Sequence, residues 1–202
     1  MKNLYSIILS LITCFCFSQT KFESGNIVFT NGNKIDCLIK HSYSDINPSA
    51  VIYKTSEKGE EKTARLNEVN SFEIYGKAKY VKATVDFDIS SNQINSLSSS
   101  RLPEYEKKTA LLQVIIEGKA SLYRLKLNGI EKYFYTIENQ EIKPLIHKKY
   151  ISNSRIQENF EYLNQLNNEI NIGKPITSTK SIRYLKSDLK KHFEKYNEIF
   201  GT

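Results

Sequence analysis

Residues 121–137 read SLYRLKL-NG-IEKYFYTI, and this stretch decides the fold class. Two runs rich in apolar and aromatic residues, 121–127 and 130–137, flank the dipeptide Asn128-Gly129. Both central residues of the tightest hairpin turns need positive φ, a region that Asn and Gly enter most readily. The pattern therefore predicts two antiparallel strands joined by a two-residue turn.

The same pattern recurs towards the N-terminus, where Asn31-Gly32-Asn33 separates two further runs. The continuous apolar run 111–116 predicts a central strand covered on both faces. One turn of helix is expected over 66–69. The other expected strands are 26–30, 34–41, 51–54, 62–66, 72–75, 80–89 and 141–145. We therefore expect an α+β protein whose antiparallel β domain, a partly open barrel or a sandwich, spans residues 19–151.

The composition changes after this domain, and residues 152–202 are expected to form a basic helical tail. Apolar residues at helical spacing predict a helix over 153–170, capped by Ser154, and a second helix capped by Ser187. Leu189, Phe193, Tyr196 and Phe200 form the apolar stripe of the second helix. Residues 143–202 carry 11 Lys and Arg against 6 Asp and Glu, so +5 of the chain's net +7 lies there.

Residues 1–18 have the pattern of a secretory signal: Lys2, an apolar stretch, and Ser18 before the expected cleavage site. A lipoprotein signal that acylates Cys14 is the alternative. Either predicts an exported protein, in the periplasm, associated with the outer membrane or secreted, with no transmembrane helix in the mature chain. Cys37 alone would remain, so no internal disulfide is expected.

The sequence contains no complete catalytic, cofactor-binding or metal-binding motif. Its three His lack metal-ligand spacing, and the phosphate-binding loop pattern is absent. Asp86 and Asp88 alternate along one strand and are expected on a solvated outer face; with Glu117, they could instead serve a hydrolase with a β cleft. The leading expectation is a non-catalytic envelope module that binds or scaffolds another component, without a cofactor.

Two regions are candidates for contact with an envelope protein or an anionic envelope surface. The long polar segment 90–108 contains Arg101, whose guanidinium suits carboxylate or phosphate recognition. The alternative is an ordered strap pinned to the sheet by Leu97, Leu102 and Tyr105. In the tail, the candidates are Lys186, Lys190, Lys191 and Lys195, although the apolar stripe beside them could simply pack on the protein's own sheet. Export argues against a nucleic-acid partner.

Several runs resemble a secreted family of the Bacteroidetes. The most specific is E-G-K-A-S-L-Y at 117–123, preceded by D-I-S-S-N at 88–92 and R-L-P at 101–103. The resemblance covers nearly all of the chain after the leader, from 22 to 197. Many relatives continue into an outer-membrane β-barrel, so it implies a periplasmic or surface module. Some relatives carry the label of a tRNA-modification GTPase; the missing phosphate-binding loop and the leader make that alternative disfavoured. The resemblance implies no catalytic residues.

Overall fold

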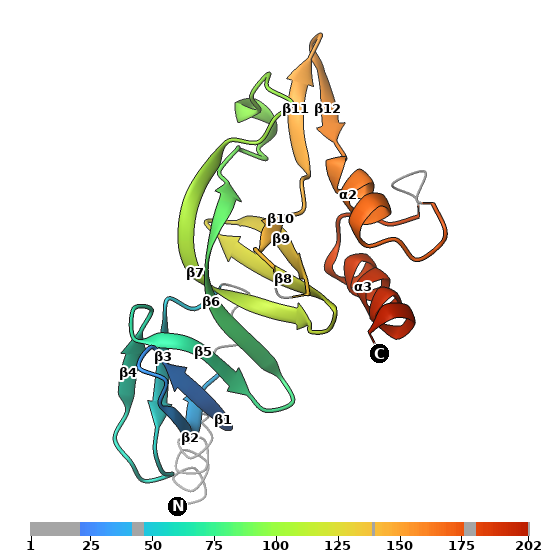
Figure 1. Ribbon diagram of the computed structural model, residues 1–202. Helices are drawn as coiled ribbons and strands as arrows, with labels where there is room; N and C mark the ends of the chain where they lie inside the picture. Colours follow the sequence, from blue (N-terminus) through green and yellow to red (C-terminus); the bar gives the residue numbers. More distant parts are fainter. Residues whose placement is uncertain (1–20, 42–46, 139, 176–180, 202) are drawn as a thin grey trace, which may run out of the picture.

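The computed structural model describes residues 21–41, 47–138, 140–175 and 181–201. Ten strands of these residues form one open antiparallel sheet in the order β10-β9-β8-β7-β6-β5-β1-β2-β3-β4 (Figure 1). A separate two-stranded sheet and two helices follow, which confirms the α+β expectation. The strands of the large sheet are β1 (Phe22–Phe29), β2 (Lys34–Lys40), β3 (Ala50–Lys54), β4 (Lys62–Arg65), β5 (Val69–Ile74), β6 (Ala78–Asp88), β7 (Tyr105–Ile116), β8 (Ala120–Leu127), β9 (Ile130–Ile137) and β10 (Lys143–Pro144).

The predicted hairpins form where the turn residues place them. Leu127 pairs with Ile130 across Asn128 and Gly129, whose φ values of 50° and 79° are those that the turn requires. Gly32, with φ of 87°, turns the chain between β1 and β2. The third predicted hairpin is the pair β3–β4. Residues 66–68 form a hydrogen-bonded turn rather than a helix.

The long strands β6 and β7 run through the middle of the sheet and join its two ends (Figure 1). Leu111 and Leu112 of β7 are fully buried and belong to different core clusters. Because neighbouring residues of a strand point to opposite faces, β7 is covered on both, as its apolar run predicts. We call β1–β5 the N-terminal lobe, and β8–β10 with the helices the C-terminal lobe.

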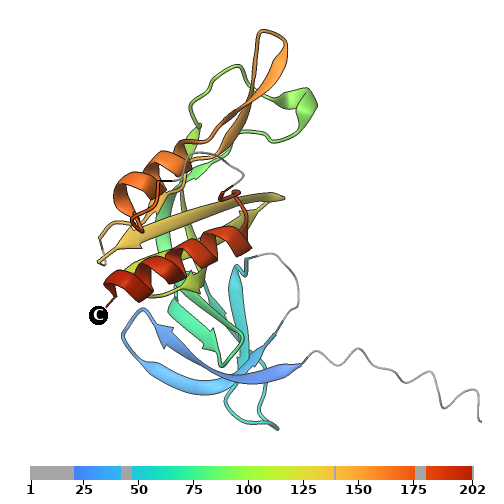
Figure 2. The same ribbon diagram turned by 90° about the vertical axis from the view of Figure 1, so that its right-hand side faces the viewer.

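Two helices cover one face of the C-terminal lobe (Figure 2). They are α2 (Glu161–Glu169) and α3 (Lys186–Phe200). Leu189 and Phe193 of α3 are fully buried in the cluster that also holds Leu122 and Tyr135 of the sheet. The apolar stripe of the last helix therefore packs on the protein's own sheet, although Phe200 at its end stays 41% exposed. No helix among the described residues is long and apolar enough to cross a membrane.

The predicted start of the first helix is wrong. Residues 148–159 form a β-hairpin, β11 (Lys148–Ser152) with β12 (Arg155–Asn159), and α2 begins only at Glu161. Asn153 and Ser154 have φ of 50° and 58° and make the hairpin turn. Ser187 is not a cap either, because α3 begins at Lys186 and the Ser187 hydroxyl contacts Asp188.

The polar segment predicted over 90–108 is shorter than expected, since β7 begins at Tyr105. The remaining loop, residues 89–104, contains one turn of 3-10 helix, η1 (Ile94–Ser96). Figure 1 shows this loop beside the β11–β12 hairpin, at the end of the molecule opposite the N-terminal lobe.

Candidate functional site

The three carboxylates of the hydrolase hypothesis do not converge. Asp86 lies 2.9 Å from Lys107 Nζ, and Glu117 lies 2.6 Å from Lys79 Nζ. Lys79 pairs with Val114 and Asp86 with Lys107 at opposite ends of the β6–β7 ladder, which separates the two carboxylates. Each is therefore neutralised by its own Lys, and no acid–base pair is assembled from them.

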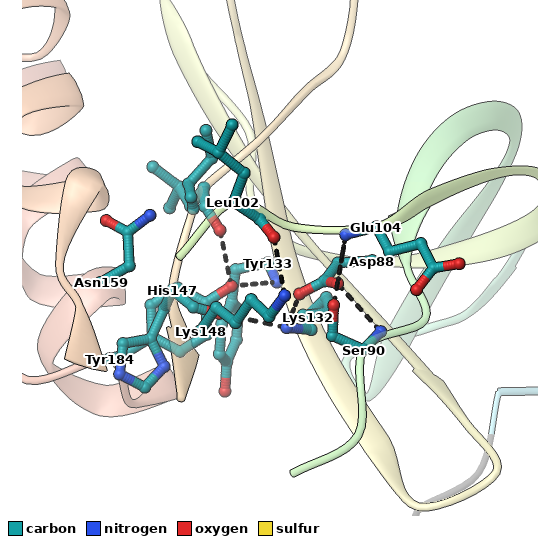
Figure 3. Close-up of polar contacts among 12 residues, drawn as sticks. Asp88, Ser90, Leu102, Glu104, Lys132, Tyr133, His147, Lys148, Asn159 and Tyr184 are labelled. Atoms are coloured by element: carbon teal, nitrogen blue, oxygen red, sulfur yellow. Dashed lines mark hydrogen bonds and ion pairs between the residues drawn. The ribbon is translucent and has the colours of Figure 1, made fainter. Parts of the chain in front are cut away.

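Asp88 is not on a solvated face as expected; it is buried together with Lys132. The Asp88 carboxylate lies 2.5 Å from Lys132 Nζ, and both side chains are about 5% exposed. The backbone N–H groups of Ser90 and Glu104 donate to the other carboxylate oxygen, at 3.0 and 3.3 Å (Figure 3). Asp88 thus ties both ends of the loop 89–104 to Lys132 of β9.

This network holds Asp88 in its ionised form. Burial alone would raise the pKa of the Asp88 carboxyl, but the hydrogen bonds from Lys132 and Ser90 and the charge of Lys132 keep that pKa below its ordinary value. The neighbouring void measures about 10 Å³, room for roughly one water molecule. The buried Asp88–Lys132 ion pair therefore holds the backbone of the loop 89–104 in place and leaves no space for a substrate.

Further contacts fasten the loop 89–104 to the β11–β12 hairpin. The Lys148 ammonium, itself buried, donates to the Leu102 carbonyl at 2.6 Å, and the Asn159 amide donates to the Arg101 carbonyl at 3.1 Å. Ile151 N–H donates to the Ser98 carbonyl at 2.9 Å. The loop is therefore an ordered strap. Of the three side chains expected to pin it, Leu102 and Tyr105 are exposed, at 71% and 40%, and Leu97 is partly buried.

An aromatic cluster joins this network to the tail. The His147 ring stacks on Tyr184 with centroids 4.7 Å apart and accepts or donates a hydrogen bond with Glu158 at 2.8 Å. Tyr184 donates to the Leu145 carbonyl and accepts from Tyr133 N–H. Burial lowers the pKa of His147 in spite of Glu158, which favours the neutral imidazole.

A sizeable pocket lies in the N-terminal lobe. It has a volume of about 550 Å³, within the range of small-molecule sites. Apolar and aromatic side chains from β2, β3, β5 and β6 form most of its wall: Ile39, Val51, Ile52, Phe72, Ile74 and Tyr80. Phe72 and Tyr80 stack with centroids 4.7 Å apart, so part of the wall is a rigid aromatic surface.

The divergence of β2 and β3 opens this cavity. Among the described residues, the two strands pair with each other at Leu38–Lys54 and Ile39–Tyr53, and the next residues, Lys40 and Ile52, are not paired with each other. Asn47 fixes the opposite side, because its side-chain amide donates to the Leu111 carbonyl at 2.7 Å and accepts from Lys126 N–H at 2.9 Å. The cavity is thus held between a splayed strand pair and an anchored Asn.

The polar residues of the described lining include Lys40 and His41. Alternation along β2 places the His41 side chain on the face of Ile39 and the Lys40 side chain on the opposite face. His41 Nδ1 lies 3.8 Å from Glu23, a buried carboxylate that Lys77 contacts at 2.5 Å. The hydrogen bond from Lys77 outweighs burial and, with the nearby positive charges, lowers the pKa of Glu23. Glu23 is therefore already paired with Lys77.

The sequence did not identify this site. One signal was present: Ile35, Cys37 and Ile39 alternate along β2, and extending the alternation puts His41 on the same inner face. Gly25, opposite Cys37, allows close strand packing, because a Cβ there would lie 2.1 Å from the Glu73 carbonyl oxygen. Cys37 is a buried core residue.

The predicted partner-binding residues occupy two separate surfaces. Arg101 is exposed on the strap. The four Lys residues of α3 are exposed along that helix, where Lys190 lies 3.4 Å from Glu194. Figure 1 places the strap and α3 at different heights of the molecule, so these residues do not form one patch. The four Lys residues of α3 are Lys186, Lys190, Lys191 and Lys195.

Over the described ranges, no group of three His, Cys, Asp or Glu side chains could hold a metal ion. The comparisons of this chain with protein-family models, curated proteins and solved structures found no match.

Proposed function

We propose that this chain is an exported cell-envelope protein that works as a non-catalytic binding module, with the N-terminal cavity as its binding site. The observation that carries the proposal is the largely apolar pocket of about 550 Å³ in the N-terminal lobe, a volume within the range of small-molecule sites. Export is supported by the signal-like residues 1–18. The pairing of each candidate carboxylate with a Lys favours binding over hydrolysis.

Binding is tested with N-phenyl-1-naphthylamine, an uncharged apolar fluorophore that brightens when it leaves water. We expect saturable fluorescence with the unsubstituted protein and a loss of at least tenfold in affinity for Ala50→Phe, since Ala50 lines the cavity. Ser99→Phe adds the same ring at an exposed position of the strap and is the matched control. Equal binding by Ala50→Phe and the unsubstituted protein would reject the cavity as the site.

Export is tested separately by intact mass after cell fractionation. A mature chain starting at Gln19 in the envelope fraction supports the simple signal, and a chain starting at acylated Cys14 supports the lipoprotein alternative. A full-length chain confined to the cytoplasm contradicts the proposal and revives the RNA-modification alternative. Arg101 and the four Lys residues of α3 stay predicted contacts for a second envelope component.

A further inference from the structure

We infer that the β11–β12 hairpin carries a second binding site, for a saccharide that bears a carboxylate. The hairpin belongs to the other end of the molecule, so the inference goes beyond the proposed function and does not depend on the N-terminal pocket. Figure 1 shows the hairpin projecting beyond the C-terminal lobe, beside the loop 89–104. A ligand as large as an oligosaccharide can therefore approach it from solvent.

One face of the hairpin gathers the side chains of this site. Tyr150 pairs with Gln157 across the two strands, and Ser152 pairs with its own partner, Arg155. Directly opposite residues and alternate residues along a strand point to the same face, so all four side chains share one face. Together with Asn153 of the turn, they line an open pocket of about 430 Å³, a volume within the range of small-molecule sites.

The base of the hairpin holds this face in place. The two strands pair from Lys148–Asn159 at the base out to Ser152–Arg155 beside the turn. At the base of the same face, the Lys148 and Asn159 side chains are buried and donate to carbonyl groups of the loop 89–104. The pocket residues are therefore ordered before a ligand arrives, which lowers the entropic cost of binding.

Packing does not account for these side chains. The three core clusters among the described residues include none of residues 150–157. Arg155 and Gln157 are exposed, and Tyr150 is half-buried. Within the described ranges, the Arg155 guanidinium makes no ion pair or hydrogen bond with another residue. The side chains of this face are therefore available to a ligand.

The lining suits a ligand rich in hydroxyl groups. The amides of Asn153 and Gln157 and the hydroxyl of Ser152 can each donate and accept hydrogen bonds, as the hydroxyl groups of a sugar do. Tyr150 adds an aromatic ring, whose negative face attracts the polarised C–H groups of a sugar ring. The described lining contains no aliphatic side chain, so a hydrocarbon ligand would gain little there.

Arg155 adds selectivity for a carboxylate. It is the one charged residue among the described residues of the lining, and its planar guanidinium can donate two parallel hydrogen bonds to a carboxylate. Glu158, the acidic residue of the hairpin, pairs with Lys149 on the opposite face and is hydrogen-bonded to His147 at 2.8 Å. No carboxylate of the hairpin therefore competes for Arg155.

The test is an NMR titration of the isotope-labelled protein with digalacturonate and with its dimethyl ester, which has the same rings but no charge. Dimannuronate and its ester repeat the comparison for a second ring stereochemistry. We expect at least one of the two acids to shift the backbone signals of residues 150–157. That acid should bind at least tenfold more tightly than its ester, with a preference that shrinks as salt rises.

Two variants of the lining and a matched control locate the recognition. Arg155→Gln should lose the preference for the acid and still bind the ester. Tyr150→Ala should weaken the binding of acid and ester alike, because both lose the ring on which they pack. Lys149→Gln removes a positive charge from the opposite face of the same hairpin and should keep both the affinity and the preference.

The inference is wrong if neither acid shifts these signals, or if each acid and its ester bind equally. It is also wrong if Lys149→Gln reduces the preference as much as Arg155→Gln, because the overall positive charge would then be responsible. Equally tight binding of inorganic phosphate or uridine monophosphate at these residues would reject the saccharide as the ligand class. The fluorophore experiment tests the N-terminal pocket separately, so failure of either proposal leaves the other standing.

Discussion

Gly118 and Asn197 give the E-G-K-A-S-L-Y run a structural meaning. The Asn197 side chain of α3 accepts from Ala120 N–H and donates to the Ala120 carbonyl, both at 2.9 Å. A Cβ on Gly118 would lie 2.3 Å from Asn197 Nδ2, so a larger residue there would displace the Asn197 side chain from Ala120. The run thus forms part of the surface against which α3 packs.

We expect Asn197→Ala to lower the free energy of unfolding by about 1–3 kcal/mol, because two backbone groups of Ala120 lose their partner. Gly118→Ala should be destabilising in the unsubstituted chain and much less so in the Asn197→Ala background, where the obstructing amide is gone. Urea unfolding of the four chains measures the coupling. Asn164→Ala, at an exposed site of α2, is the control and should change stability little. If the two substitutions change the free energy of unfolding additively, the proposed contact between Gly118 and Asn197 is wrong.

The Asp88–Lys132 pair predicts acid sensitivity. The Asp88 pKa is lowered on folding, so its contribution to stability is complete above the ordinary carboxyl value of 3.8 and is lost as the pH falls through the folded-state pKa. We expect Asp88→Asn to cost about 3–5 kcal/mol near neutral pH, because Lys132 stays buried without its counter-charge. Urea unfolding from pH 7 to 3 should show a shallower acid loss in this variant. An unchanged pH dependence would refute the assignment.

At the scale of elements, the amphipathic helix α3 stabilises the sheet on which it lies. Leu189 and Phe193 are fully buried, whereas the Lys residues face solvent. Burial of such side chains contributes roughly 1.5–3 kcal/mol each. The tail is therefore part of the C-terminal lobe, and any partner contact through its Lys residues would use the exposed side of a docked helix.

Phe193→Ala should lower the free energy of unfolding by about 3–5 kcal/mol, because it empties a closed part of the core. Phe200→Ala, on the same helix but 41% exposed, should cost much less and is the matched control. Thermal unfolding followed by circular dichroism measures both. Similar small losses in both variants would mean that α3 does not anchor the lobe.

Turn chemistry explains which elements the sequence predicts. Asn128-Gly129 and Gly32 have few alternatives to positive φ, so their hairpins are predictable. Asn153-Ser154 reads equally as a helix start, because Ser is a favoured cap and apolar residues follow at helical spacing. Cross-strand pairing with β11 decided in favour of the hairpin, and that pairing is a tertiary effect.

The candidate site was harder to predict than the sheet. Its cavity depends on where β2 and β3 separate and on Asn47 reaching β7 and β8, and neither contact is visible in a local pattern. The burial of Asp88 likewise depends on Lys132, which β9 brings from far along the chain. Val85 and Phe87, which alternate with Asp86 and Asp88, are core residues, but alternation cannot show that Asp88 has a buried partner.

For the whole molecule, the shared strands β6 and β7 predict that the two lobes unfold together. Leu111 belongs to the core of the N-terminal lobe, and its neighbour Leu112 belongs to a cluster in contact with β8 and β9. Cys37 reports on the N-terminal lobe, because burial, with a smaller effect of Asp36, raises its pKa to about 11.

In a chain carrying Cys14→Ser and Cys16→Ser, we expect Cys37 to react with a disulfide reagent at pH 8 only when the protein unfolds. Phe193→Ala in the other lobe should then speed the labelling of Cys37 by roughly the factor that its loss of stability implies, about tenfold for each 1.4 kcal/mol. Phe200→Ala should leave the labelling rate nearly unchanged. Lobes that open independently would show unchanged labelling in Phe193→Ala despite its lower stability.

The strand order also bears on how the protein acquires its structure. Each strand of the large sheet pairs with its neighbour in the chain except at one junction, where β5 pairs with β1 and β2–β4 intervene. Neighbouring strands can pair as soon as both have been synthesised, but β1 must wait for β5 with one edge open. During that interval Phe22–Phe29 is a site for misassembly with another chain, so the first hairpin is the segment that a chaperone would have most reason to shield.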